Sequence, residues 1–95
     1  MRNVPVYSIS EISKVIQFPV DEVEQALFYP DYPKHILIND DSIFGLVIDL
    51  RREYARHLRN DDSHGKNAVS KMIDIAESII DAFNGKLPRE FFIEK

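Results

Sequence analysis

A cluster of arginines is the clearest chemical feature of the chain. Its members are Arg51, Arg52, Arg56 and Arg59. At about 100° per residue in a helix, these side chains fall within roughly 140° of one another. Guanidinium groups gathered on one side suit the phosphates of a nucleic acid or the carboxylates of a partner protein. A third interpretation is a solvated face on which the arginines pair with Asp49 and Glu53 of the same segment.

Residues with catalytic or metal-binding potential are scattered along the sequence. Of the histidines at 35, 57 and 64, only His64 lies close to carboxylates, those of Asp61 and Asp62, and a solvated loop accounts for that grouping. No serine stands in the sequence of a nucleophile elbow, and the three glycines form no phosphate-binding loop. We therefore expect a non-enzymatic protein without a cofactor or a metal ion.

Composition narrows the choice of partner and compartment. The chain of 95 residues fits one domain and contains no cysteine, which favours a reducing compartment. It has neither an apolar signal segment at its start nor a run of about 20 apolar residues, so we expect a cytoplasmic protein that does not enter a membrane. The net charge of −4 weighs against strong nonspecific nucleic-acid binding. It does not exclude DNA binding, because a locally basic face matters more than the total charge.

The arginines belong to a segment whose other side is apolar. Residues 41–59 are expected to form a helix, with Asp41 or Ser42 as the N-cap. The polar break at 60–65 separates this helix from a second one at 66–84. The two helices would form an αα-hairpin, or the second would swing away as a dimer arm. The apolar residues expected to face inward from the first helix are Ile43, Leu46, Val47, Leu50, Tyr54 and Leu58.

The second long helix carries an apolar stripe close to a heptad seam. The stripe fits either the protein core or a dimer interface. The tail that follows is also apolar, and we expect it to dock on the core or on a second subunit. The residues considered for a dimer or partner interface are Val69, Met72, Ile73, Ala76, Ile80, Phe83, Phe91 and Phe92.

The first part of the chain predicts two short helices joined by a tight turn. Residues 8–16 begin with Ser8 and Glu11 at the spacing of a capping box, and residues 19–28 begin with proline. Their lengths match a helix-turn-helix, in which Gln25 would approach a DNA groove and Lys34 would extend the basic face. The alternative is a plain helical corner, because the second helix carries acids and no base. Residues 4–7 and 35–38 are expected to pair as a minimal β-hairpin.

Several features of residues 4–58 follow one another in a familiar order. A short strand precedes the helix S-I-S-E-I-S, and the segment Y-P-K precedes a β-rich run and the helix V-I-D-L-R-R-E-Y-A-R. This order resembles the small winged-helix regulators of phages and mobile elements, namely excisionases and, more closely, the pyocin-activator type. The resemblance implies a winged helix-turn-helix that binds DNA. The helix at 66–84 has no counterpart in the shortest members, which suggests an added oligomerisation element.

These observations combine into one expectation. The fold is mainly α (α+β), a winged-helix-like helix-turn-helix module at 1–60 followed by a C-terminal helix and tail at 61–95 that belong to the same domain. The function expected is that of a small DNA-binding transcriptional regulator acting as a homodimer. The alternative is an adaptor, or a phage-encoded inhibitor that docks on a host protein, with Tyr29, Tyr32, Phe91 and Phe92 as candidate anchors. The residues expected at DNA are Arg51, Arg52, Arg56, Arg59, Gln25 and Lys34.

Overall fold

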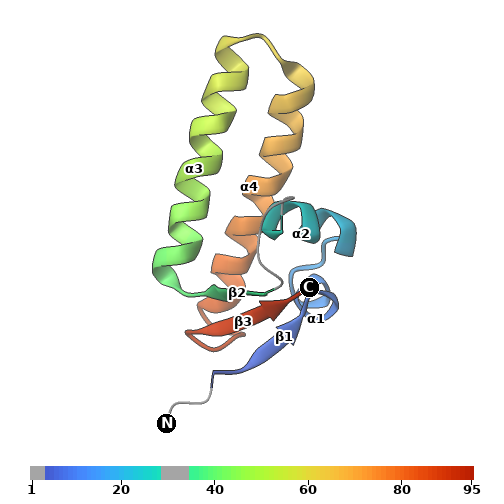
Figure 1. Cartoon of the computed structure of the whole chain (residues 1–95), viewed down its shortest axis with the longest axis vertical. Coiled ribbons are helices and arrows are strands. Elements are labelled where there is room, and N and C mark those ends of the chain that lie inside the picture. The colour runs from blue at the N-terminus through green and yellow to red at the C-terminus, as the bar shows by residue number, and fades with distance from the viewer. Residues whose placement is uncertain (1–3, 29–34) are drawn as a thin grey trace.

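Two long helices form an antiparallel hairpin that gives the protein its elongated shape (Figure 1). They are α3 (Asp40–Arg59) and α4 (Ser63–Phe83), joined by only three residues. A computed structural model describes residues 4–28 and 35–95 of the chain. The longest dimension, 48 Å against 26 and 23 Å, runs along this hairpin. Of the two arrangements that the sequence allowed for the long helices, the structure has the αα-hairpin.

Capping side chains set where the two long helices begin. Asn39 caps α3: its side-chain oxygen accepts from the Ser42 amide at 2.9 Å, and its own amide donates to the Ser42 hydroxyl. The expected N-cap at Asp41 or Ser42 is therefore wrong by two or three residues. Asp62 caps α4 by accepting from the Gly65 amide at 3.0 Å. This cap lets α4 start three residues earlier than expected and shortens the polar break.

The first part of the chain folds into the expected pair of short helices. They are α1 (Ile9–Ile16) and α2 (Val20–Leu27). Ser8 caps α1 by accepting from the Glu11 amide at 3.2 Å. The turn between the helices contains Gln17 in the left-handed region, with φ 64°, and the buried Ser13 hydroxyl donates to the Phe18 carbonyl. This corner matches the expectation from sequence.

The sheet differs from the expected hairpin. Its strands are β1 (Val6–Ser8), β2 (His35–Ile38) and β3 (Phe91–Glu94), in the order β1-β3-β2. The expected pairing of the first strand with the second is wrong, because β3 lies between them, parallel to β1 and antiparallel to β2. Phe91 and Ile93 are fully buried on one side of β3, so the apolar tail gains more burial at the centre of the sheet than at its edge.

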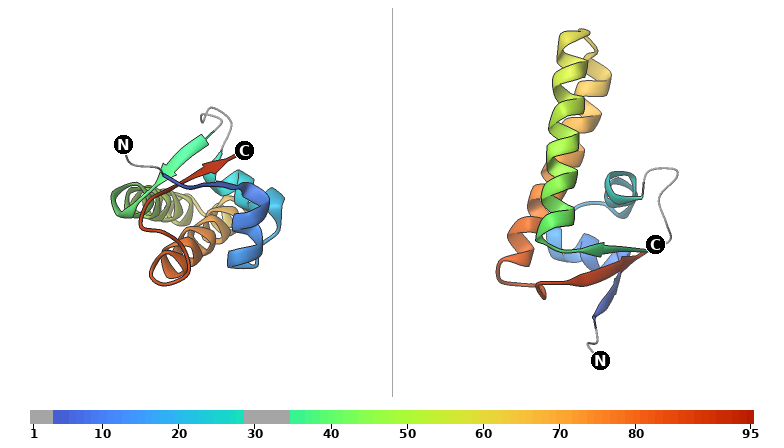
Figure 2. Two further views of the ribbon diagram at one scale, coloured as in Figure 1. Left: turned by 90° about the horizontal axis from the view of Figure 1, so that it is seen from below. Right: turned by 60° about the vertical axis from the view of Figure 1, so that its left-hand side comes forward.

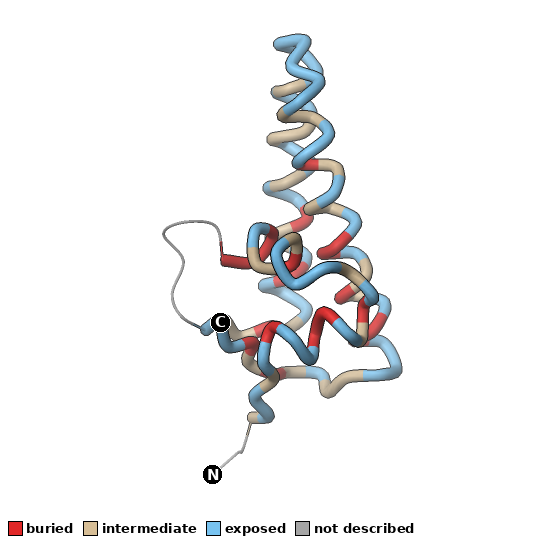
Figure 3. Tube along the Cα trace, turned by 90° about the vertical axis from the view of Figure 1, so that its right-hand side faces the viewer, coloured by how far each residue is buried: buried red, intermediate tan, exposed pale blue. Residues whose placement is uncertain are grey.

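Helix α4 holds the protein together. It packs against α1, α2 and α3, whereas within the described residues no Cα atom of α2 lies within 8 Å of a Cα atom of α3. The sheet lies across one end of the hairpin (Figure 2), and the buried residues concentrate near that end (Figure 3). The result is a small, mostly helical α+β fold with four helices and three strands in the part of the chain described. Among the most deeply buried core residues are Ile12, Val23, Ile38, Ile43, Ile75, Ile79, Phe91 and Ile93.

Candidate functional site

The four arginines of α3 divide into two pairs. Arg51 Nη2 lies 2.7 Å from Glu77 Oε1 of α4, and Arg56 Nη2 lies 2.5 Å from Glu53 Oε2 of α3 itself. Arg52 and Arg59 form no ion pair with any residue that the structure describes. Glu53 is a partner that the sequence suggested, whereas Glu77 comes from a segment 26 residues away in the chain and was not foreseen. Of these four arginines, Arg52 and Arg59 are the two whose guanidinium groups form no ion pair with the described residues.

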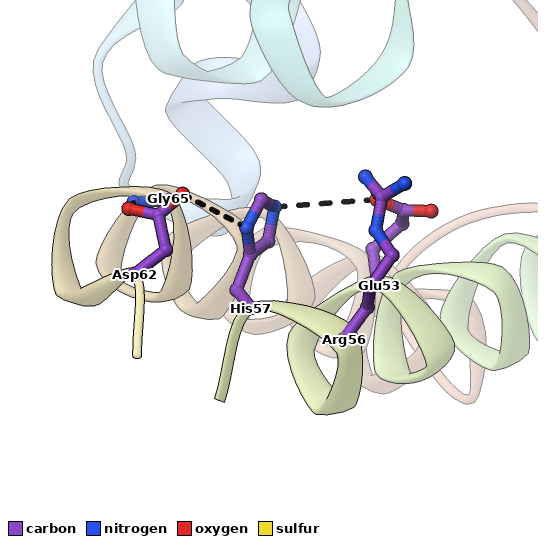
Figure 4. A network of polar contacts seen from close by, with 5 residues as sticks. All are labelled: Glu53, Arg56, His57, Asp62 and Gly65. Carbon is purple, nitrogen blue, oxygen red and sulfur yellow. Dashed lines mark hydrogen bonds and ion pairs between the residues drawn. The ribbon is translucent and has the colours of Figure 1, made fainter. Parts of the chain in front are cut away.

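Polar contacts at the hairpin tip link α3 to the start of α4 (Figure 4). His57 lies between two carboxylates: its Nδ1 is 3.1 Å from Asp62 Oδ2, and its Nε2 is 4.0 Å from Glu53 Oε2. The Gly65 amide, and secondarily His57, hold the pKa of Asp62 below its ordinary value. No hydroxyl of the described residues is hydrogen-bonded to His57. We interpret the network as a clamp that joins the two long helices.

One exposed side of α3 presents a mixed apolar and charged surface. We call it the outer α3 face. At about 100° per residue its members fall within roughly 80° of one another, and all are exposed. Phe44 and Ile48, one turn apart, keep 51% and 52% of their surface accessible. The outer α3 face consists of Asp41, Phe44, Ile48, Arg52, Ala55 and Arg59.

The opposite side of α3 explains why this face is left open. Ile43 and Val47 are buried, and α4 is the main element against which α3 packs. Phe44 and Ile48 lie outside that stripe, and the sequence analysis missed them. The two residues are four positions apart and lie outside the apolar stripe assigned to the core. This spacing could have indicated a second apolar surface on the same helix. Leu58, expected inside, is 58% exposed, because the opposing first turns of α4 supply only small or polar side chains.

Those of the expected DNA-contacting residues that the structure describes do not come together on one surface. Helix α2, which carries the exposed Gln25, and helix α3 lie on opposite sides of α4 (Figure 1). Two acids of α2 are paired: Glu22 lies 2.5 Å from the Lys71 ammonium and Glu24 lies 3.2 Å from that of Lys95. Lys34, like the candidate anchors Tyr29 and Tyr32, lies outside the described residues.

The expected dimer residues divide by burial. Val69, Ala76, Phe83 and Phe91 are buried within this chain, where the fold itself covers them. The rings of Phe83 and Phe91 pack at a centroid distance of 6.1 Å. The remaining four keep part of their surface accessible. These half-buried residues are Met72, Ile73, Ile80 and Phe92.

A groove of about 540 Å³ runs between β2 and the first half of α3. Its apolar walls include Leu27, Ile36 and Leu46. Its polar side chains, among them Asp41 and Asp49, form no hydrogen bond or ion pair with one another within the described part of the chain. The groove therefore offers a mainly apolar contact surface that shares Asp41 with the outer α3 face.

Comparisons with known proteins add no relative. No family model matches the chain, and no curated protein or solved structure matches it either. In residues 4–28 and 35–95, no helix has the length and apolar character needed to cross a membrane. The same residues gather no group of three histidine or carboxylate side chains suited to a metal ion.

Proposed function

We propose that the protein is a non-enzymatic binding module that docks on a protein surface through the outer α3 face. The observation that carries this proposal is that one face presents two half-exposed apolar side chains, Phe44 and Ile48, beside Arg52 and Arg59, which form no ion pair with the described residues. Isolated exposed apolar residues are common on protein surfaces. Here they stand one turn apart and continue into Arg52 and Arg59 over the length of one helix.

The chemistry of this face defines the partner. Phe44 and Ile48 suit an apolar pocket or a second apolar helix face, since burying them removes apolar area from water. Arg52 and Arg59 suit carboxylates at the edge of such a surface, where charge complementarity sets orientation and association rate. The partner surface therefore covers apolar side chains at one end of the face and supplies a carboxylate at the other.

Site-specific photo-crosslinking tests the proposal. A photoreactive phenylalanine analogue replaces Ile48 in the full chain, and the protein is irradiated in the cells that encode it. We expect a discrete adduct that is lost in the double variant Arg52→Glu/Arg59→Glu. The matched control, Lys14→Glu/Lys86→Glu, changes the net charge by the same amount at exposed positions elsewhere. An adduct equally strong in both double variants would contradict the role of the arginines, and no adduct would contradict the docking face itself.

A second candidate is DNA binding by a dimeric regulator, as the sequence resemblance implies. The observation in its favour is that Lys71 and Lys95 offset the charge of Glu22 and Glu24, which reduces the repulsion between α2 and phosphates. Because α2 and α3 lie on opposite sides of α4, one straight duplex facing α2 would not reach the arginines as well.

A gel shift on mixed duplex DNA at low salt distinguishes the two functions. DNA binding through the arginines predicts a shift at micromolar protein and a flatter salt dependence in Arg52→Ala/Arg59→Ala. The paired arginines provide the control, since Arg51→Ala/Arg56→Ala also removes two positive charges. An unchanged salt dependence in the first variant would exclude phosphate contact by the unpaired arginines. No shift at all favours the protein-docking function.

A further inference from the structure

Charges of opposite sign stand at the two ends of the outer α3 face. Asp41 lies in the first turn of α3 and Arg59 is its last residue. Neither side chain forms an ion pair with any residue that the structure describes. They are 18 positions apart (59 − 41), which is roughly 27 Å along a helix. The face therefore begins with a negative charge and ends with a positive one.

We propose that the partner of the outer α3 face is the same face of a second copy, with the two α3 helices packed antiparallel. This inference rests on the proposed function, because it uses the same docking face and names its occupant. An antiparallel pair places Asp41 of each copy opposite Arg59 of the other. A parallel pair would instead bring like charges together, which is unfavourable. The charge pattern thus selects one orientation, and a twofold axis relates the two copies.

The residues between the charged ends fit the same register. With Asp41 opposite Arg59, residue i faces residue 100 − i, so Phe44 lies opposite position 56 and next to Ala55. A large side chain then meets a small one, which allows two helices to approach to the usual 8–10 Å. Ile48 lies opposite Arg52, whose aliphatic stem can cover it while the guanidinium group stays in water. The Arg52 guanidinium groups of the two copies then lie about one helical turn apart along the axis, where they stay in water.

The size of the face sets the strength of this association. One pair of helices about 27 Å long gives an interface at the low end of the range for specific complexes. Phe44 and Ile48 lose exposed apolar surface on pairing, but each is already half covered in the single chain. We therefore expect a reversible dimer whose population changes with protein concentration.

Sedimentation of the full chain at about 5 to 500 µM, a range chosen for a weak interface, tests the pairing. We expect the mass to rise from 11.1 kDa toward twice that value. Asp41→Arg and Arg59→Asp should each raise the protein concentration at which half of the chains are dimeric by at least about tenfold over the wild-type value. The double variant Asp41→Arg/Arg59→Asp should restore it. Each reversed charge opposes the helix dipole, so the recovery cannot come from a more stable α3.

Two further variants locate the interface. Ile48→Asp should leave a folded monomer, and circular dichroism checks that the fold is intact. Asp74→Arg, an exposed position on α4, should dimerise like the wild type. The proposal is overturned if the wild type stays at 11.1 kDa throughout, if the double charge reversal fails to restore the dimer, or if Ile48→Asp dimerises normally.

Crosslinking at position 48 separates this inference from the proposed function. An adduct of two copies of the chain supports both. A wild type that remains monomeric but forms an Arg52- and Arg59-dependent adduct with a different protein overturns self-pairing and keeps the docking face. The absence of any adduct overturns both.

Discussion

His57 Nδ1 lies 3.1 Å from Asp62 Oδ2, across the turn that joins the two long helices. The same Asp62 carboxylate accepts from the Gly65 amide and so caps α4. One side chain therefore fixes the start of α4 and ties it to the end of α3. This relationship explains how a connection of only three residues reverses the chain, and it leads to the first two predictions.

The Asp62 clamp makes stability depend on pH. The Gly65 amide, and then His57, lower the pKa of Asp62 from its ordinary 3.8 in the folded state. A lowered folded-state pKa contributes stability that is present above the unfolded value and is lost as the pH falls through the folded value. We expect the free energy of unfolding of the wild type to exceed that of Asp62→Asn at pH 7, and this difference to shrink below pH 3.8.

Urea unfolding between about pH 2 and 7, the range in which carboxylates titrate, measures this difference. The control is Asp81→Asn, an exposed α4 position whose carboxylate forms no hydrogen bond or ion pair with the described residues. A difference between wild type and Asp62→Asn that stays constant over this range would show that the clamp does not titrate.

Replacement by alanine should affect the stability of the protein differently at two helical glycines. A Cβ at Gly65 would lie 2.6 Å from His57 Nδ1 and 2.7 Å from Asp62 Oδ2, whereas a Cβ at Gly45 meets nothing within 4 Å. Gly45→Ala should therefore stabilise the protein by about 0.5–1 kcal/mol through backbone entropy. Gly65→Ala should lose that gain because the His57–Asp62 contact must open. Thermal unfolding of both variants tests this, and an equal gain at both positions would contradict it.

Neighbouring phenylalanines of β3 should differ in their effect on stability. Phe91 is fully buried and its ring lies 5.5 Å from that of Tyr7, while Phe92 is only half buried and meets His35. Phe91→Ala should cost about 3–5 kcal/mol, a large fraction of the stability of a small domain. Phe92→Ala should cost clearly less. Chemical denaturation measures both, and similar losses would mean that β3 does not occupy the centre of the sheet.

A fragment of residues 1–60 should not fold by itself. It lacks α4 and β3, which cover Ile12, Val23 and Ile43 and which contribute Ile75 and Ile79 to the core. We expect a weak helical signal in circular dichroism and no cooperative thermal transition. Adding a peptide of residues 61–95 should restore the transition. Cooperative unfolding of the fragment alone would contradict the shared core.

Much of the local structure was predictable from the sequence. The cap at Ser8, the turn at residues 17–19 and the three- and four-residue spacing of Ile9, Ile12 and Ile16 involve residues close together in the chain, so their interactions can be read locally. The pairing of Arg56 with Glu53 was foreseen for the same reason. These features are determined by the sequence alone.

The tertiary structure decided the sheet and the candidate site. A strand of three or four residues carries little pairing information, so nothing local indicated that β3 would enter between β1 and β2. Similarly, the Arg51–Glu77 contact joins two helices, and only their packing shows that Arg52 and Arg59 are the two arginines of α3 without an ion pair in the described part of the chain. Side-chain exposure and ion pairing depend on which element lies opposite, and that is set by burial over the whole chain rather than by neighbouring residues.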